Sequence, residues 1–251
     1  EALEKLFTSR LSVLTGTAGT GKTTVIRSLV QGIKKADPRH DFLLLAPTGK
    51  ATLILRDRLN DPSVSVMTIH SFLMRKGWIN RNNFTLKISG GQKSQVSTLI
   101  IDECSMIEVM LFATMLRAID IDNIERIILV GDNNQLPPIG PGKIFFDLIK
   151  YLKGDSSLTE RHLAELHYNW RQAQGSKSSI LASHFAKVAE IPDEDILTEI
   201  GSGVYDIQNQ NNTSDLIIDY WKDDDELIKK IPNILEYAIT RLEHGSSSEN
   251  L

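Results

Sequence analysis

The sequence predicts an α/β fold in which helices flank a parallel β-sheet. Five apolar, β-rich runs alternate along the chain with segments of helical periodicity. The runs hold consecutive Leu, Ile and Val residues without polar alternation, which is typical of strands buried on both faces. Such strands occur where helices cover both sides of a parallel sheet. The expected strands are residues 11–14, 42–46, 98–101, 126–130 and 162–166.

Helices are expected after each of the first four strands, and the rhythm then changes. The first predicted helix begins near Lys22, and the other three cover residues 50–59, 107–119 and 143–152. Residues 75–95 carry a polar turn and are predicted to form a short β-hairpin insertion. Beyond Gly175 we expect a mostly helical, acidic extension, with helices to about residue 190 and at 214–221 and 226–241, and a strand near 204–207.

Composition excludes several classes of protein. The chain has 251 residues, a net charge of −4 and one cysteine, Cys104. No run is long and apolar enough to span a bilayer, and the first ten residues lack a secretory signal, so no membrane partner is expected. A single cysteine excludes an internal disulfide and favours a reducing, cytoplasmic location.

Positive charge is concentrated in one part of the chain. Residues 34–93 hold 11 Lys and Arg against 4 Asp and Glu, a net +7, which leaves −11 for the remainder. The chain is therefore not a uniformly basic nucleic-acid-binding protein. A local basic surface and ordinary solvated loops explain the pattern equally well.

Residues 16–24 contain a phosphate-binding motif. The segment GTAGTGKT at 16–23 fits G-x-x-x-x-G-K-[ST], follows an expected strand and begins an expected helix. Its glycines let backbone N–H groups point at phosphates, and the helix N-terminus adds partial positive charge. Lys22 is expected to reach the β- and γ-phosphates and Thr23 to bind Mg²⁺. A plain glycine turn is the alternative. The residues predicted to bind ATP are Gly16, Thr17, Ala18, Gly19, Thr20, Gly21, Lys22, Thr23 and Thr24.

An acidic pair follows the expected strand at 98–101. In open α/β sheets ligands bind at the carboxyl ends of strands, which would bring Asp102 close to the phosphate loop. Asp102 is predicted to hold Mg²⁺, through water, and Glu103 to be the general base for the attacking water. The alternative is that Asp102 or Ser105 caps a helix.

Further motifs make the prediction more specific. The segment GDNNQLPPIGPG at 131–142 resembles motif III of superfamily 1 helicases. APTGKA at 46–51 resembles motif Ia, TIH at 68–70 resembles the next DNA-contacting motif, and YNWRQ at 168–172 resembles motif IV. Together with DECSM at 102–106, these motifs are similar to those of the exodeoxyribonuclease V alpha-subunit family, within superfamily 1B. The resemblance covers residues 11–188.

This resemblance implies a RecA-like P-loop NTPase fold and an ATP-driven motor that moves 5′ to 3′ on single-stranded DNA in recombination or repair. It implies that Gln135 senses the γ-phosphate and that Arg171 points at it, so the predicted catalytic residues are Lys22, Glu103, Gln135 and Arg171. Other helicase or nuclease subunits are further expected partners. The implied DNA-contacting residues are Pro47, Thr48, Lys50, Thr68 and His70.

Ordinary structural roles remain open for some of these residues. Lys50 and His70 fit solvated or hydrogen-bonding positions at helix starts as well as DNA contacts. Trp78 and Phe84 fit packing within the hairpin as well as base platforms.

The expected domain organisation follows the same resemblance. Residues 1–172 form a RecA-like ATPase domain, with the 75–95 hairpin at the position of domain 1B; residues 173–241 begin a second motor domain or extension. Residues 242–251 are interpreted as a vector-derived tag. Since too few residues follow for a complete second domain, we expect the chain to bind nucleotide but hydrolyse it slowly.

Other classes stay open. The helicase domain of a conjugative relaxase, an RNA helicase, a nucleotide-dependent switch or kinase, and a P-loop scaffold without helicase activity share the phosphate loop. ATP hydrolysis with and without single-stranded DNA distinguishes the switch or kinase and the scaffold from a DNA helicase.

Overall fold

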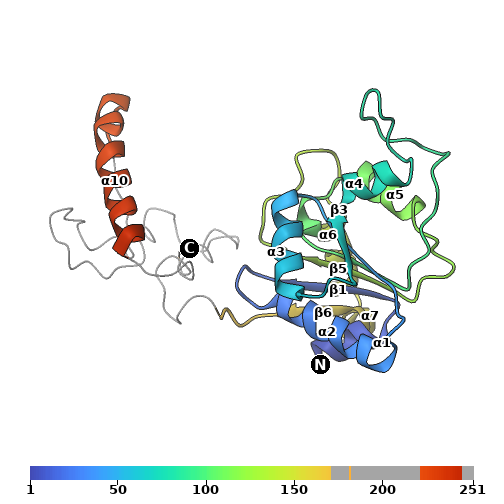
Figure 1. Ribbon diagram of the computed structural model, residues 1–251. Helices are drawn as coiled ribbons and strands as arrows, with labels where there is room; N and C mark the ends of the chain where they lie inside the picture. Colours follow the sequence, from blue (N-terminus) through green and yellow to red (C-terminus); the bar gives the residue numbers. More distant parts are fainter. Residues whose placement is uncertain (171–180, 182–220, 245–251) are drawn as a thin grey trace. The chain divides into compact units, whose positions relative to one another are not determined.

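The computed structural model describes residues 1–170, residue 181 and residues 221–244 (Figure 1). The chain divides into two compact units, Glu1–Ala173 and Gln174–Leu251. Arg171 and the elements expected at 175–190, 204–207 and 214–221 lie outside the described residues, apart from residues 181 and 221.

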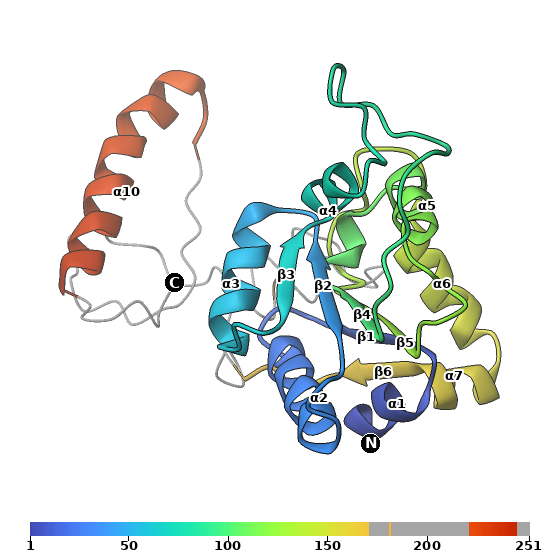
Figure 2. The same ribbon diagram turned by 45° about the vertical axis from the view of Figure 1, so that its right-hand side comes forward.

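The first unit is built on a six-stranded sheet in which every neighbouring pair is parallel, in the order β3-β2-β4-β5-β1-β6. Figure 2 shows the sheet from β3 at one edge to β6 at the other. The parallel α/β architecture predicted from the sequence is confirmed. The strands are β1 (Leu11–Gly16), β2 (Phe42–Ala46), β3 (Ser65–Thr68), β4 (Thr98–Ile101), β5 (Arg126–Gly131) and β6 (Leu163–Leu166).

Strand β3 was not expected. It lies at the edge of the sheet and pairs only with β2. Its four residues, SVMT, are polar at both ends, and only Val66 is buried. A four-residue run with polar ends lacks the continuous apolar character by which the central strands are recognised.

Helices cover both faces of the sheet and divide its core in two. Leu6, Ile26 and Leu55 pack on one face together with strand residues such as Leu14. Phe72, Met115 and Phe145 pack on the other face, together with Val13. Figure 2 shows α2 and α3 on one side of the sheet and α5 and α6 on the other. The helices are α1 (Ala2–Thr8), α2 (Lys22–Ala36), α3 (Gly49–Leu59), α4 (Ile69–Arg75), α5 (Val109–Arg117), α6 (Ile144–Lys153) and α7 (Ser156–His162), with the 3₁₀ turn η1 (Cys104–Met106) before α5.

The expected helix at 107–119 is shorter than predicted, because η1 occupies the preceding turn and α5 ends at Arg117. Helices α1 and α7 were not expected, and α4 was expected only in so far as His70 fits a helix start. Each has seven residues, two turns, which is too short to produce a clear apolar period.

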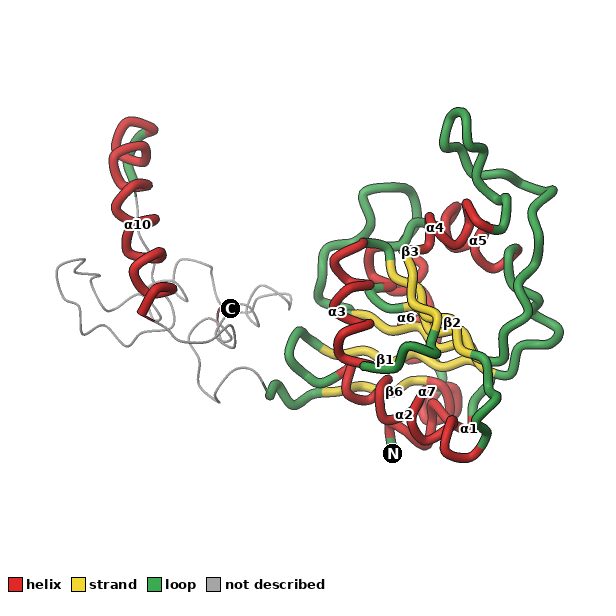
Figure 3. The backbone as a smooth tube through the Cα atoms, in the orientation of Figure 1, coloured by secondary structure: helices red, strands yellow, loops and turns green. Residues whose placement is uncertain are grey.

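The insertion at residues 75–95 is a hairpin turn with little strand structure (Figure 3). A single antiparallel bridge joins Ile79 to Leu86, and the Lys87 N–H donates to the Trp78 carbonyl at 2.9 Å. Trp78 is buried, and its Nε1–H donates to the Gln92 carbonyl at 2.9 Å. The packing role that the sequence left open for Trp78 is therefore the one observed, whereas Phe84 is 71% exposed.

In the second unit the described residues include α10 (Asp224–His244), which covers the helix expected at 226–241. Its first turn holds Asp224, Asp225 and Glu226, which suits the positive end of the helix dipole. Within the described residues, no helix is both long enough and apolar enough to cross a membrane.

Candidate active site

All six strands of the sheet run in the same direction, so their carboxyl ends meet at one edge. A cavity of about 720 Å³ opens there. Its lining comes from segments far apart in the sequence: residues 18–25 of the phosphate loop and α2, with Ala51, Ile54, Arg58, Asp102, Glu103, Gln135, Leu166 and Trp170.

The phosphate loop connects β1 to α2 through tight backbone turns. Gly19 and Gly21 have φ angles of +84° and +89°, which favour glycine. A Cβ at Gly16 would lie 2.6 Å from Thr20 Oγ1 and 2.8 Å from the Leu166 carbonyl oxygen, so a larger residue does not fit. Seven of the nine predicted ATP-binding residues, Ala18 to Thr24, line the 720 Å³ cavity, while Gly16 and Thr17 line a smaller neighbouring cavity of about 210 Å³.

Lys22 and Thr23 begin α2 within this cavity. The Lys22 Nζ donates to the carbonyl oxygens of Gly16, at 2.6 Å, and Thr17, at 3.0 Å. The ammonium group is therefore held inside the curve of the phosphate loop, where a phosphate chain would lie.

Asp102 lies directly after β4, and the residue is partly buried. Its Oδ1 accepts a hydrogen bond from the Glu103 N–H at 2.9 Å. Burial, and next the nearby negative charge of Glu103, raise the pKa of Asp102 to about 6, against the opposing effect of Lys22. A carboxylate destabilised in this way is suited to a cation partner.

Glu103 combines two unusual features. Its backbone φ is +53°, a left-handed conformation that residues other than glycine rarely adopt. Its Oε2 atom is buried and has no hydrogen-bond partner among the described residues. The alternative in which Asp102 caps a helix is not observed. The turn η1 has Glu103 at its N-cap position, and no side chain caps it.

A magnesium–nucleotide complex fits this donor set. The Thr23 hydroxyl and the Asp102 carboxyl group line the same cavity, and Mg²⁺ prefers oxygen ligands of these types together with phosphate oxygens and water. The unpartnered Glu103 oxygen adds an acceptor for a water molecule.

Gln135 is held by a residue that the sequence did not single out for this purpose. The buried Ser105 hydroxyl donates to Gln135 Oε1 at 2.8 Å, and it joins the DECSM segment to the GDNNQ segment. The loop is further fixed by the buried Asp132, whose Oδ1 accepts from the Asn134 N–H at 2.9 Å. The only signal in the sequence was the serine two positions after the acidic pair.

Trp170 lines the cavity and had no predicted role. Its backbone N–H donates to the Gly19 carbonyl at 2.9 Å, and its ring lies 4.4 Å from that of Tyr168, centroid to centroid. The indole is 76% exposed at the cavity. The predicted Arg171 is the next residue and lies outside the described part of the chain.

The predicted DNA-contacting residues come together beside the cavity, at the carboxyl ends of β2 and β3. These two strands are neighbours, with Ala46 opposite Thr68. Thr48 caps α3 by accepting from the Ala51 N–H, and Thr68 caps α4 by accepting from the Ser71 N–H. Pro47 is half-buried, and Lys50 and His70 are exposed near the starts of α3 and α4. The capping bonds are thus made by Thr48 and Thr68, while Lys50 and His70 stand exposed in the first turns of the two helices.

Comparison with known protein families decides the family. A profile described as AAA domain matches residues 1–141, more than half of the chain. The chain belongs to the AAA domain family. Membership implies that this P-loop domain binds nucleotide.

Relatives of this AAA domain narrow the resemblance. The chain is 38% identical over 159 residues to an uncharacterized protein of Methanocaldococcus jannaschii, which covers 61% of this chain and 13% of that protein. It is 33% identical over 178 residues to the RecBCD enzyme subunit RecD of Buchnera aphidicola subsp. Schizaphis graminum, which covers 62% of this chain and 28% of that subunit. The chain thus spans less than a third of the length of either relative.

The fold also has a match among solved structures. A structure described as "Structural Basis for DNA Unwinding at Forked dsDNA by two coordinating Pif1 helicases" aligns with a TM-score of 0.50 at 22% identity, covering 80% of this chain and 51% of that one. This match supports the RecA-like fold. The predicted resemblance to RecD-like superfamily 1 motor domains is confirmed by these comparisons.

Proposed function

We propose that the chain is the ATP-binding and hydrolysing motor domain of a DNA helicase, which moves 5′ to 3′ on single-stranded DNA in recombination or repair. One observation carries the proposal: the phosphate loop, the acidic pair and Gln135 line a single cavity. A scaffold without catalysis would not require the unpartnered buried oxygen of Glu103.

Thr23 and Asp102 would hold Mg²⁺, which supplies positive charge to the β- and γ-phosphates when bound. Lys22 exchanges its bonds to the loop carbonyls for phosphate oxygens and so neutralises charge that develops during hydrolysis. Arg171, beyond the described residues, would add a second positive group from motif IV.

Glu103 is the proposed general base. Its Oε2 has no competing hydrogen-bond donor among the described residues, so it is available to take a proton from water. Gln135, fixed by Ser105, then orients or senses the γ-phosphate side of the cavity. The exposed Trp170 ring provides an apolar surface against which a purine can stack.

Single-stranded DNA would cross the carboxyl edge near Thr48, Lys50 and His70. Backbone N–H groups and side chains at the starts of α3 and α4 would contact phosphates and give affinity without sequence preference. Residues 1–172 would be the first motor domain, residues 173–241 the start of a second domain or extension, and the whole protein would act in the cytoplasm. Helicase or nuclease subunits are proposed as its partners.

The test measures nucleotide binding by calorimetry and ATP hydrolysis with and without single-stranded DNA. The wild-type chain should bind Mg²⁺–ATP, and Lys22→Ala should lose binding. Glu103→Gln should still bind but lose hydrolysis by about 10²- to 10⁴-fold.

Three results would count against the proposal. Hydrolysis retained by Glu103→Gln removes Glu103 as the base. Nucleotide affinity and hydrolysis that are both indifferent to single-stranded DNA favour a switch, a kinase or a scaffold. Stronger stimulation by an RNA oligonucleotide of the same sequence indicates an RNA-directed enzyme.

A further inference from the structure

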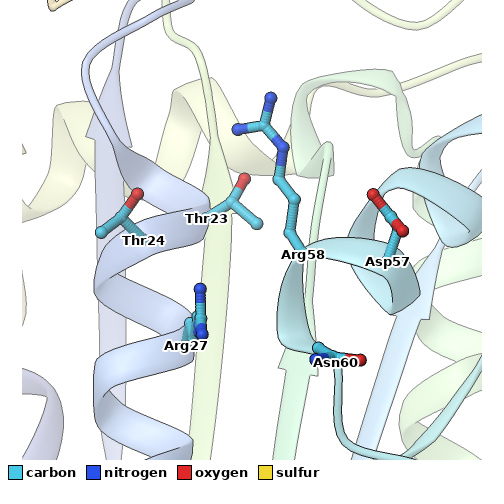
Figure 4. Close-up of a pocket in the computed structure, with 6 residues that line it drawn as sticks. All are labelled: Thr23, Thr24, Arg27, Asp57, Arg58 and Asn60. Carbon is cyan, nitrogen blue, oxygen red and sulfur yellow. The ribbon is translucent and has the colours of Figure 1, made fainter.

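A groove of about 510 Å³ lies between α2 and α3, beside the candidate active site (Figure 4). It is lined by Thr23, Thr24, Arg27, Asp57, Arg58 and Asn60. Three of these residues, Thr23, Thr24 and Arg58, also line the 720 Å³ cavity, so the groove and the cavity adjoin.

The two arginines of the groove differ in one respect. Arg58 lines both the groove and the active-site cavity, whereas Arg27 lines only the groove. In Figure 4 the Arg58 side chain extends from α3 so that its guanidinium group lies beside Thr23. Thr23 is the predicted magnesium ligand, so this end of Arg58 is on the side of the terminal phosphates.

The Arg58 guanidinium is exposed and has no hydrogen-bond or ion-pair partner among the described residues. Arg56, two residues earlier, is engaged: its Nη2 donates to the Val66 carbonyl at 2.8 Å and ties α3 to β3. Arg58 is therefore not required for packing, and its donors remain available.

The backbone beneath Arg58 is nevertheless fixed. The flanking Leu55 and Leu59 are buried in the core, and Asn60 ends the helix with its N–H bonded to the Arg56 carbonyl at 3.0 Å. Ala51, Ile54 and Arg58 follow one another at helical spacing and all line the cavity. A guanidinium group without a described partner, on a fixed helix and at the cavity that holds the phosphate loop, is the arrangement of a ligand-binding residue.

We propose that Arg58 binds the terminal phosphate of the nucleoside triphosphate and so distinguishes a triphosphate from a diphosphate; this rests on the proposed function. A guanidinium group donates two parallel hydrogen bonds to phosphate oxygens. The acidic pair in the same cavity adds negative charge to that of the triphosphate, so a further cation beside Lys22 stabilises the complex. Arg27 takes no part.

Calorimetric titration with ATPγS and with ADP, both with Mg²⁺, tests the assignment. Arg58→Ala should weaken ATPγS binding by about tenfold or more and leave ADP binding unchanged. Arg58→Lys should recover part of the loss, because the charge is kept and the paired donors are not. Arg27→Ala, the matched control, should bind both nucleotides like the wild type.

Each other outcome contradicts the assignment. If Arg58→Ala binds ATPγS normally, or loses ATPγS and ADP equally, Arg58 is not a terminal-phosphate residue. If Arg27→Ala shows the same selective loss, the effect belongs to the general charge of the groove. If the wild-type chain binds neither nucleotide, the proposed function itself fails. Circular dichroism of each variant confirms that it is folded.

Discussion

Glu103 carries two energetic costs that a purely structural residue would avoid. A non-glycine side chain in a left-handed conformation costs on the order of 1–3 kcal/mol, and a buried polar atom without a partner costs a similar amount. Folding tolerates both at one residue, next to an Asp102 whose pKa is raised by burial. Because both costs reduce the stability of the fold, a catalytic role for Glu103 explains them better than a structural role does.

Ser105 makes a prediction at the same scale. Ser105→Ala removes the only described hydrogen bond to Gln135 Oε1, so the glutamine loses its fixed orientation. We expect KM for ATP to stay near the wild-type value and kcat to fall about five- to tenfold, as for one lost hydrogen bond. Steady-state ATPase assays measure both constants.

The double variant is the control for a positioning role. If Ser105 acts only through Gln135, then Ser105→Ala combined with Gln135→Ala should be no slower than Gln135→Ala alone. Additive losses would show that Ser105 acts in another way, for example by maintaining the core.

Some residues of the site can be predicted from sequence motifs, and others are recognised only in the folded structure. Lys22, Thr23 and Asp102 follow from local motifs, because phosphate and magnesium binding require particular residue types at fixed spacing along the chain. Ser105, Trp170 and Arg58 have no such spacing to their partners. Their part in the cavity depends on elements 30 to about 150 residues apart, which only the folded sheet brings together.

At the scale of elements, the insertion depends on one close contact. A Cβ at Gly91 would lie 2.4 Å from Trp78 Cδ1 and Nε1, and Trp78 is the buried anchor of the hairpin. Gly91→Ala should displace the indole and destabilise the chain by about 1–3 kcal/mol, as overpacking does. Urea unfolding followed by tryptophan emission should show lower stability and a red-shifted native spectrum.

Gly32 is the matched control, since a Cβ there meets no atom within 4 Å and the residue lies inside α2. Gly32→Ala should instead stabilise the chain by about 0.5–1 kcal/mol. A Gly91→Ala variant as stable as Gly32→Ala would mean that Trp78 moves without cost.

The elements that sequence reasoning missed share a physical cause. The buried strands and long amphipathic helices repeat their pattern often enough to be recognised. Strand β3 and helices α1, α4 and α7 have four to seven residues each. Their structure is decided by neighbours, as when the edge of β2 supplies the partner for β3.

At the scale of the molecule, one ion pair makes stability depend on pH. The Lys34 side chain bonds Asp61 Oδ2 at 2.8 Å, and this bond, followed by that from Ser63, lowers the pKa of Asp61 to about 2. A lowered folded-state pKa stabilises the fold above the unfolded value near 4, and this stabilisation is lost as pH falls toward 2. Asp61→Asn should therefore reduce the free energy of unfolding at pH 7 by about 1 kcal/mol or less.

Urea unfolding at pH 7, 5 and 3 measures this dependence. The difference between wild type and Asp61→Asn should be the same at pH 7 and 5 and smaller at pH 3. Lys34→Met should give a similar loss that does not add to that of Asp61→Asn. A difference that grows toward low pH would refute the assigned role of the pair.

The order of strands also sets a length scale. Counting along the sheet from β3 and β2, which precede the predicted DNA-contacting residues, to β1, which precedes the phosphate loop, gives three to four strand spacings, roughly 14 to 19 Å. Helix α3 begins beside Thr48 and lines the cavity with Ala51 and Ile54. A polynucleotide that displaces this helix would therefore move one wall of the cavity, which makes the stiffness of α3 a functional property.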